Sequence, residues 1–379
     1  MHRPCVPPDP ARPLRRAAAL LAAWAACAAA SAAPSPPPVV SPEVSADGRV
    51  TFRMLAPNAH AVSVAGIRHL PEQPMTRDER GVWSVTVGPL EPDVYSYTFT
   101  LDGAVVTDPH DRDIKKYFSS ESLFEVPGRP PILAQAQPVP HGVVHHQFYA
   151  SRVRGVDAGM EVYTPPGYDP RASRLYPVVY LLHGYGDRED AWVDVGHANT
   201  IADNLIAQGR IAPMILVMPY GHAVPVPQDH SVKDYGAANN EAMAMDLIGQ
   251  IIPLVEHDYR ADPRAPARAI VGLSMGGGQS LDIGLYHPDL FGWVGAFSAA
   301  APQTDLDATY TRVVGDPASR PRVLWIAVGR EDGLLKRNQA FHEWLAAKGI
   351  AHTWVVSDGG HEWPVWRAYL PQFLELIFR

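Results

Sequence analysis

Cysteine is almost absent from this chain, which has only Cys5 and Cys27 among its 379 residues. Both lie within residues 1–32, a segment that we expect to be removed, so the remaining chain has neither disulfides nor thiol chemistry. An excess of basic residues is also missing. The formal net charge is −8, which argues against a nucleic-acid partner and against binding to an anionic membrane surface.

Motifs for metals and nucleotides are missing too. The chain contains no H-E-x-x-H pattern, no Walker loop and no dinucleotide-binding fingerprint. The adjacent His145 and His146 lie in what we predict to be an early strand, and they are not part of a recognisable metal-ligand pattern. We therefore expect a protein that uses no metal and no cofactor.

The N-terminus has the composition of a secretory signal peptide. Four arginines between Arg3 and Arg16 precede an apolar, alanine-rich run at residues 17–30, and small residues suited to cleavage follow at 30–32. A transmembrane anchor is the alternative, but the run is short for a bilayer. A lipoprotein signal ending at Cys27 is disfavoured because Trp24 stands where an aliphatic residue is expected. We expect secretion to the periplasm or the medium and no membrane contact after cleavage of residues 1–32.

The rest of the chain divides into two predicted domains, which suits its length. A proline-rich spacer at 33–43 precedes residues 44–126, where short alternating strands separated by turn residues indicate a small β-sandwich. A second proline-rich stretch at 127–141 is the predicted linker. From residue 142 to 379, nearly continuous apolar runs alternate with helical patterns, which predicts an α/β fold with a mostly parallel central sheet. These apolar runs are residues 176–182, 214–218, 323–328 and 353–356.

A G-x-S-x-G pattern at residues 272–276 is the most informative motif. It follows an apolar run at 268–271 that we predict to be a buried strand, and this context is typical of a nucleophile elbow. The turn there is so tight that side chains in place of Gly272 and Gly276 would collide with the neighbouring strand and helix. Ser274 is therefore the candidate nucleophile, although a serine in an ordinary tight turn gives the same short pattern.

A nucleophilic serine needs a histidine to accept its proton and a carboxylate to orient that histidine. In α/β-hydrolases the order along the chain is serine, acid, histidine. Asp332 follows the predicted strand that ends at Val328, and His361 follows the last predicted strand in the same way. Taken alone, Asp332 is also compatible with a solvated turn, and His361 with a loop cap or a metal ligand.

Three other carboxylates are candidates for the acid that orients the histidine. Glu331 is next to Asp332, but the shorter side chain beside a glycine is better suited to turn beneath the imidazole. Asp305 and Asp307 follow no predicted strand closely. Asp332 is the preferred acid.

The oxyanion hole is expected to consist of backbone N–H groups. Met275, the residue after the nucleophile, supplies one, and Tyr185 in the loop after an earlier strand supplies the other. His183 in that loop is interpreted as structural. Trp192 and Trp363 are candidates to flank the substrate, and the loop at 221–240 is long enough to line one side of a cleft.

The second domain resembles the putative esterase family, which contains carbohydrate esterases (family 1) of the feruloyl and acetyl-xylan type. The resemblance covers residues 142–379 and is closest, around residues 192–206, to bacterial feruloyl esterases attached to xylanases. It implies an α/β-hydrolase fold, hydrolysis of ferulate esters on arabinoxylan, and a triad of Ser274, Asp332 and His361. The matching stretches are VYTPPGY (162–168), LLHG (181–184), GHAN (196–199), ADNLI (202–206), GLSMGG (272–277) and GHEWPVWR (360–367).

Residues 44–126 resemble the immunoglobulin-like modules that precede some of these esterases and are related to the starch- and glycogen-associated module CBM48. The stretches that carry this resemblance are GVWS (81–84) and YSY (95–97). Glycan binding by exposed aromatic residues is one implied role. A buried core role for Trp83, Tyr95, Tyr97 and Phe99, in a domain that shapes the active-site cleft, is the preferred one.

The resemblance leaves more than one substrate open. We expect a secreted serine esterase that acts on an acylated oligo- or polysaccharide. Siderophore (enterochelin-type) esterases share the same two-domain layout, and an acetyl-xylan esterase, an acyltransferase or a catalytically silent glycan-binding protein are further alternatives. The sequence carries no indication of the oligomeric state.

Overall fold

The computed structural model describes residues 38–116, 118–226 and 235–379. The predicted signal peptide at 1–32 lies outside the described residues, as do residues 33–37 of the predicted spacer at 33–43 and part of the loop at 221–240. Residues Val40–Arg379 form one compact unit. Within the described part of the chain, no helix combines the length and the apolarity needed to span a bilayer.

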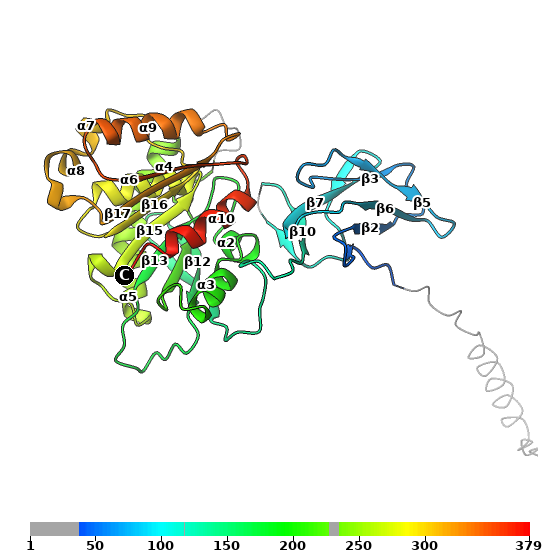
Figure 1. Ribbon diagram of the computed structural model, residues 1–379, viewed down its shortest axis with the longest axis horizontal. Helices are drawn as coiled ribbons and strands as arrows, with labels where there is room; N and C mark the ends of the chain where they lie inside the picture. Colours follow the sequence, from blue (N-terminus) through cyan, green and yellow to red (C-terminus); the bar gives the residue numbers. More distant parts are fainter. Residues whose placement is uncertain (1–37, 117, 227–234) are drawn as a thin grey trace, which may run out of the picture. The chain divides into compact units, whose positions relative to one another are not determined.

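Two antiparallel sheets form the N-terminal β-sandwich (Figure 1). The first sheet has the strand order β1 (Glu43–Val44), β2 (Val50–Leu55), β6 (Val82–Val87) and β5 (Thr76–Arg77). The second has the order β4 (Gln73–Pro74), β3 (Val62–Ala65), β7 (Asp93–Leu101), β10 (Glu121–Val126) and β9 (Ile114–Lys115), with β8 (Ala104–Val106) paired to β7. Along β2, every second side chain is buried, as the alternating sequence predicts.

The aromatic residues of the sandwich lie in its core. Tyr97 and Phe99 are fully buried, and Trp83 and Tyr95 are 8% and 7% exposed. The Phe52 ring packs against both Tyr97 and Phe99, with ring centroids 4.8 and 6.5 Å apart. The predicted sandwich is therefore confirmed, and these four aromatic residues belong to its core.

A single eight-stranded sheet forms the centre of the second domain. Its order is β11 (Val143–Ser151), β12 (Val156–Thr164), β14 (Ile215–Pro219), β13 (Val178–Leu182), β15 (Arg268–Leu273), β16 (Trp293–Phe297), β17 (Val323–Gly329) and β18 (Thr353–Ser357). β11 and β12 are antiparallel to their neighbours, and the other six strands are parallel. This confirms the predicted α/β fold with a mostly parallel sheet.

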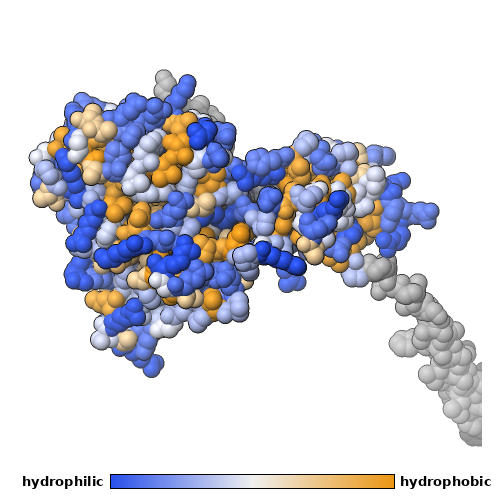
Figure 2. Space-filling model, in the orientation of Figure 1, coloured by the Kyte–Doolittle hydropathy of each residue, from blue (hydrophilic) through white to orange (hydrophobic). Residues whose placement is uncertain are grey.

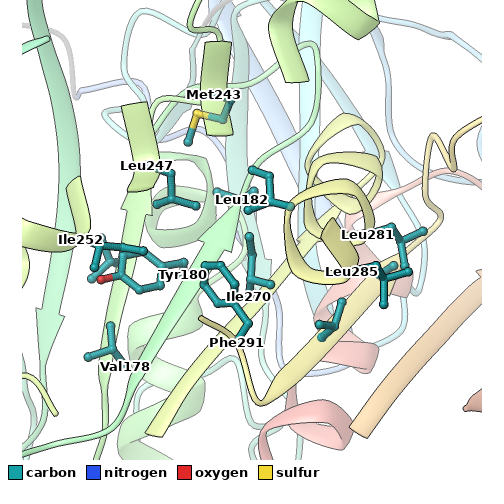
Figure 3. Close-up of a cluster of buried hydrophobic side chains, with 14 of the residues drawn as sticks. Val178, Tyr180, Leu182, Met243, Leu247, Ile252, Ile270, Leu281, Leu285 and Phe291 are labelled. Carbon is teal, nitrogen blue, oxygen red and sulfur yellow. The ribbon is translucent and has the colours of Figure 1, made fainter. Parts of the chain in front are cut away.

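Helices cover both faces of this sheet, and the central strands are therefore buried on both sides. Side chains of α4 (Tyr235–Asp246), the π-helical turn η1 (Leu247–Ile251), α5 (Ile252–Asp258), α6 (Met275–Tyr286), α8 (Thr311–Gly315) and α9 (Leu335–Ala347) belong to one apolar core. Figure 3 shows part of this core, where Tyr180 of β13, Phe291 and Ile270 of β15 lie side by side. The opposite core contains α2 (Ala191–Asp194), α3 (Ala198–Ala207) and α10 (Trp363–Leu374).

The remaining elements are short. They are the helix α7 (Leu306–Thr309) and the 3₁₀ turns η2 (Ala265–Ala267) and η3 (Pro317–Ser319). The visible face of the molecule is mostly hydrophilic, with apolar residues in separate patches (Figure 2). The parallel arrangement brings the carboxyl ends of β13, β15, β16, β17 and β18 to one edge of the sheet, and the candidate site is built on the loops that leave this edge.

Candidate active site

Ser274 occupies the one-residue turn between β15 and α6. Its φ of 53° and ψ of −114° lie in a region that residues with side chains rarely adopt. Two backbone hydrogen bonds hold it there: its N–H donates to the Phe297 carbonyl, and its carbonyl accepts from the Ala300 N–H, both at 2.8 Å. The strained conformation is therefore fixed by the neighbouring strand end rather than by Ser274 itself.

The glycines of the motif are required by close backbone approach. A Cβ atom on Gly272 would lie 2.6 Å from the carbonyl carbon of Gly276, and one on Gly276 would lie 2.5 Å from the Leu182 carbonyl oxygen. Both distances are far below van der Waals contact. β15, α6 and the end of β13 can therefore meet only because these positions lack side chains, which is the steric reason that the sequence predicts.

The structure brings Ser274, His361 and Asp332 together in a continuous hydrogen-bond chain. His361 Nε2 lies 2.9 Å from Ser274 Oγ, and His361 Nδ1 lies 2.9 Å from Asp332 Oδ2. A carboxylate can only accept, so Nδ1 carries the proton and Nε2 is left as the acceptor for the serine hydroxyl. The His361 side chain is 37% exposed and the Asp332 side chain is fully buried. The base is thus accessible while its carboxylate partner is shielded from water.

The environment of Asp332 favours its ionised form. Burial alone would raise the pKa of this carboxyl, but hydrogen bonds from His361, from the Leu334 N–H at 2.7 Å and from Ser298 lower it overall. The other two aspartates considered for this role have different partners. Asp305 caps α7, and Asp307 accepts from Trp344 and pairs with Lys348.

Ser298 and Trp366 belong to the site although the sequence analysis did not single them out. Ser298 is fully buried and has a φ of 46°, and its hydroxyl accepts a hydrogen bond from Trp366 Nε1 at 3.0 Å. The Trp366 ring also packs edge-on against the His361 ring, with centroids 4.9 Å apart. One signal was available: Ser298 directly follows β16, the same strand-end placement that identified Asp332.

The two predicted oxyanion donors lie on segments that border Ser274. Met275 is the first residue of α6, where N–H groups have no partner within the helix and the helix dipole favours negative charge. The loop that contains Tyr185 passes close to the nucleophile, because a Cβ built on Gly184 would lie 3.5 Å from Ser274 Cβ. The assignment of the Tyr185 and Met275 amides as donors stays a prediction.

His183 holds this loop in place. Its Nε2 accepts a hydrogen bond from the Gly221 N–H at 2.8 Å, so Nδ1 carries the proton and donates to the Gly184 carbonyl at 2.7 Å. Burial lowers the pKa of His183 to about 4, which keeps the imidazole neutral at physiological pH. A neutral ring with both nitrogens occupied is not available as a second base.

A cavity of about 560 Å³ opens onto the triad. Ser274 and His361 line it together with the predicted residues Tyr185 and Trp363. The sandwich also contributes to the lining of this cavity, through strands β7, β9 and β10 and the turn after β3. These sandwich residues are Gly66, Arg68, His69, Val94, Tyr95, Ser96, Lys115, Glu121 and Leu123.

The prediction that Trp192 flanks the substrate is wrong. Its side chain is fully buried, and its Nε1 donates to the Leu182 carbonyl at 3.0 Å. The indole packs edge-on against Trp363, with centroids 5.1 Å apart, so it supports the cavity wall from behind. The sequence could not separate the two indoles, because both follow strand ends and only tertiary packing decides which one faces the cavity.

Two ion pairs connect the sandwich to the elements around His361. Arg68 Nε lies 2.9 Å from Oε2 of Glu362, the residue next to His361. Arg367 on α10 is buried, pairs with Asp93 at 2.8 Å and donates to the Val94 carbonyl at 2.6 Å. The sandwich is therefore in direct contact with the segment that presents the base.

The histidines considered as metal ligands have other partners. His145 Nε2 lies 3.1 Å from Thr164 Oγ1, and His146 Nδ1 lies 2.5 Å from Glu161 Oε1. Among the described residues, no group of three or more His, Cys, Asp or Glu side chains is arranged to hold a metal ion.

Comparisons with known proteins bear on both domains. A family model described as "Putative esterase" matches residues 151–377, and one described as "Carbohydrate-binding module 48 (Isoamylase N-terminal domain)" matches residues 40–111. The endo-1,4-beta-xylanase/feruloyl esterase of Xylanibacter ruminicola is 32% identical over 353 residues, which cover 89% of this chain and 46% of that protein. The chain thus spans less than half the length of this relative.

Two solved structures are similar over large parts of the chain. A CE1 ferulic acid esterase from Anaeromyces mucronatus, in complex with ferulic acid, is 28% identical with a TM-score of 0.58 and covers 64% of this chain and 93% of its own. The enterobactin esterase of Shigella flexneri, in the presence of enterobactin, has a TM-score of 0.60 and covers 86% of this chain and 92% of its own. At 20% identity, this second likeness shows the fold alone.

Proposed function

This chain belongs to the putative esterase family and is a carboxylic-ester hydrolase, and from that premise we propose that it is a secreted serine esterase that cleaves feruloyl esters on plant cell-wall polysaccharide such as arabinoxylan. The observation that carries the mechanism is the unbroken hydrogen-bond chain from Ser274 through His361 to Asp332, with both steps at 2.9 Å. Secretion rests on residues 1–32, and N-terminal sequencing of protein recovered outside the cytoplasm tests it.

In the acylation step, Ser274 Oγ attacks the ester carbonyl carbon while its proton moves to His361 Nε2. Asp332 remains ionised, holds the Nδ1 proton and stabilises the imidazolium that forms. The carbonyl oxygen becomes an oxyanion, which the Tyr185 and Met275 amides stabilise; one such donor is worth about 10²- to 10³-fold in rate. Collapse of this intermediate breaks the ester bond, and His361 gives its proton to the departing alcohol oxygen.

In the deacylation step, water enters the place that the alcohol has left. His361 takes a proton from this water as its oxygen attacks the acyl carbonyl, and the second oxyanion occupies the same two amides. Ser274 then leaves with the proton from His361, and the free acid is released. Apart from the ester and the water, the groups that act in these steps are side chains and backbone amides of this chain.

The choice of feruloyl esters rests on similarity. The Xylanibacter ruminicola relative is named a xylanase and feruloyl esterase, and the Anaeromyces mucronatus structure is that of a ferulic acid esterase. The carbohydrate-binding-module match at 40–111 is in keeping with a glycan-linked substrate. A siderophore esterase is the second candidate, because the Shigella flexneri structure extends over both domains and not over the hydrolase alone.

Replacing the nucleophile tests the mechanism. Ser274→Ala is expected to lower kcat on methyl ferulate by at least about 10⁴-fold, since no other group can form the acyl-enzyme. The wild-type protein should also be labelled at Ser274 by a fluorophosphonate. Ser173→Ala, at an exposed serine outside the cavity, is the matched control and should keep wild-type activity. Turnover by Ser274→Ala at the wild-type rate would refute the assignment.

A substrate panel separates the substrate classes. Wild-type protein is assayed with methyl ferulate, feruloylated arabino-oligosaccharide, acetylated xylan and a catecholate triester. We expect the highest kcat/KM on the feruloylated arabino-oligosaccharide. A higher kcat/KM on the catecholate triester would favour the siderophore esterase, and labelling without turnover of any of the four would contradict both proposals.

A further inference from the structure

Lys115 is a cationic side chain that the catalytic mechanism does not use, yet it lines the catalytic cavity. It lies at the end of β9 in the sandwich, directly opposite Glu121 of β10 in the strand register. Its side chain is only 20% exposed. A lysine that is mostly withdrawn from water beside a nucleophile calls for a partner that accepts its hydrogen bonds.

The two carboxylates nearest to Lys115 are too far away to be direct hydrogen-bond partners. Its Nζ lies 3.9 Å from Glu121 Oε1 and 4.0 Å from Asp187 Oδ1. A nitrogen–oxygen hydrogen bond is about 2.7–3.2 Å long. The attraction between these charges remains, but neither carboxylate is close enough to accept a direct hydrogen bond from the ammonium group.

The two separations are compatible with a hydroxyl group that bridges the ammonium and a carboxylate. A hydroxyl oxygen that accepts from an ammonium at about 2.8 Å and donates to a carboxylate at about 2.7 Å holds the two outer atoms about 4 Å apart when the angle at the hydroxyl oxygen is about 95°. A carboxylate or phosphate ligand cannot play this part, because it has no proton to donate to Glu121 or Asp187. Neutral groups with several hydroxyls are the chemistry that fits.

Asp187 places this group of residues beside the nucleophile. Its Oδ2 would lie 3.2 Å from a Cβ built on Gly184, and Ser274 Cβ would lie 3.5 Å from the same point. The Asp187 side chain is 8% exposed and accepts a hydrogen bond from Trp363, another residue of the cavity wall. In an ester of a sugar, the hydroxyls on carbons next to the ester oxygen lie within a few ångströms of the reacting carbonyl.

Two other cationic side chains of the sandwich, Arg68 and Lys116, form short ion pairs with other residues. Arg68 pairs with Glu362 at 2.9 Å, and Lys116, the neighbour of Lys115, pairs with Asp190 and Asp194 at 3.0 and 2.9 Å. Lys116 does not line the catalytic cavity. Of these three cationic side chains, Lys115 is the one that has only long ion pairs and faces the cavity.

We propose that Lys115, together with Glu121 and Asp187, forms a hydroxyl-binding subsite for the sugar alcohol from which the ester is cleaved. The subsite is shared between the two domains, so the sandwich takes part in substrate recognition through polar groups in the catalytic cavity. This inference rests on the proposed function, since it names the residues that recognise the alcohol part of the same substrate.

The test is a ratio of two substrates in full-length variants. We expect Lys115→Met to lower the ratio of kcat/KM for feruloyl-arabinose to kcat/KM for methyl ferulate by about tenfold, because only the sugar ester loses a hydrogen bond. Lys116→Met, at the neighbouring lysine outside the cavity, should leave the ratio unchanged. If Lys115→Met impairs folding, Lys115→Gln replaces it, with the same expectation. An unchanged ratio in the Lys115 variant, or an equal fall in the Lys116 control, overturns the proposal.

A binding measurement separates failure of the subsite from failure of the proposed function. Calorimetry with Ser274→Ala and an unesterified arabinoxylo-oligosaccharide needs no turnover. We expect the Kd to rise about tenfold when Lys115→Met is added to Ser274→Ala. Equal Kd values overturn the subsite even if feruloyl esters are hydrolysed. Lack of feruloyl esterase activity with a tenfold difference in Kd contradicts the proposed function and supports the subsite.

Discussion

At the scale of single residues, the hydrogen-bond chain that ends at Ser274 includes more than the three residues of the proposed triad. Trp366 donates to Ser298, Ser298 donates to Asp332, and Asp332 holds His361 against Ser274. Ser298 can do both because one hydroxyl offers an acceptor and a donor. The strained backbone of Ser298 persists because its N–H is fixed to the Ala327 carbonyl at 2.7 Å.

We predict that Ser298→Ala lowers kcat on methyl ferulate by about tenfold, the cost of one lost hydrogen bond to a charged acceptor. KM should change little, since Ser298 is buried and does not line the cavity. Steady-state kinetics measure both constants. Ser280→Ala is the matched control, because this buried serine donates to the Gly276 carbonyl and does not contact Asp332. A loss in the control as large as in Ser298→Ala would argue against a specific role.

Asp187 gives a prediction for pH dependence. Burial raises its pKa to about 6, although Lys115 and the Gly184 N–H act in the opposite direction. A carboxyl whose pKa is raised by folding binds its proton more tightly in the folded state, so its stabilising contribution is complete below the unfolded pKa of about 4. That contribution is lost as the pH rises through about 6.

The free energy of unfolding of the wild type should therefore fall relative to that of Asp187→Asn between pH 4 and pH 7. The expected change in the difference is on the order of 1–3 kcal/mol, since each pKa unit corresponds to about 1.4 kcal/mol. Urea unfolding of both proteins at several pH values measures it. A difference that stays constant over this range would show that the carboxyl of Asp187 titrates normally.

At the scale of elements, the site depends on how closely α6 approaches β13. We predict that Gly276→Ala destabilises the protein by about 2–4 kcal/mol and slows fluorophosphonate labelling, because the new methyl group meets the Leu182 and His183 carbonyls at 2.5–2.6 Å. Thermal unfolding and labelling rates measure the two effects. Gly249→Ala, at an exposed helical position with open space around its Cβ, is the control and should not lower either.

The strands that precede Asp332 and His361 could be predicted from the sequence because each is a nearly continuous apolar run. The apolar runs at 323–328 and 353–356 coincide closely with β17 and β18. Strand-end placement then identified Asp332 and His361, since parallel strands deliver their following residues to the same edge. The apolar spacing of residues 243–259 gives no sign of the π-helical turn η1, because a one-residue change of hydrogen-bond register leaves no mark in that spacing.

The rest of the site could not be predicted from local patterns. Ser298 is one small polar residue among many at strand ends, and its role depends on Trp366, which lies 68 positions further along the chain. Trp192 has the apolar context of both a core residue and a substrate contact, and packing against Trp363 decides between them. Lys115 enters the cavity from another domain, and no spacing rule connects it to Ser274.

At the scale of the whole molecule, the two domains are held together by a buried arginine. Arg367 on α10 is 5% exposed, and besides Asp93 and Val94 of the sandwich it donates to the Val195 carbonyl of the hydrolase domain at 2.7 Å. Burial lowers the pKa of Arg367, against the opposing effect of Asp93. Such a pair costs much to break, because the remaining charge stays buried without a partner.

We predict that Arg367→Met lowers the free energy of unfolding by on the order of 3 kcal/mol. Arg312→Met is the control: its ion pair with Asp289 is more than half exposed on both sides, so its loss should cost less than about 1 kcal/mol. Calorimetry of both variants measures the difference. Equal destabilisation of the two variants would mean that Arg367 does not anchor the sandwich.

The residues that line the shared cavity come from two separate parts of the chain. The groups proposed to break the ester are encoded after residue 182, whereas part of the cavity wall is encoded before residue 127. If the proposed subsite is correct, substitutions in the turn after β3 or in β9 would change which alcohol is accepted without touching a reacting atom. Exchange of the whole sandwich would then be a route to a new alcohol preference that leaves Ser274, His361 and Asp332 in place.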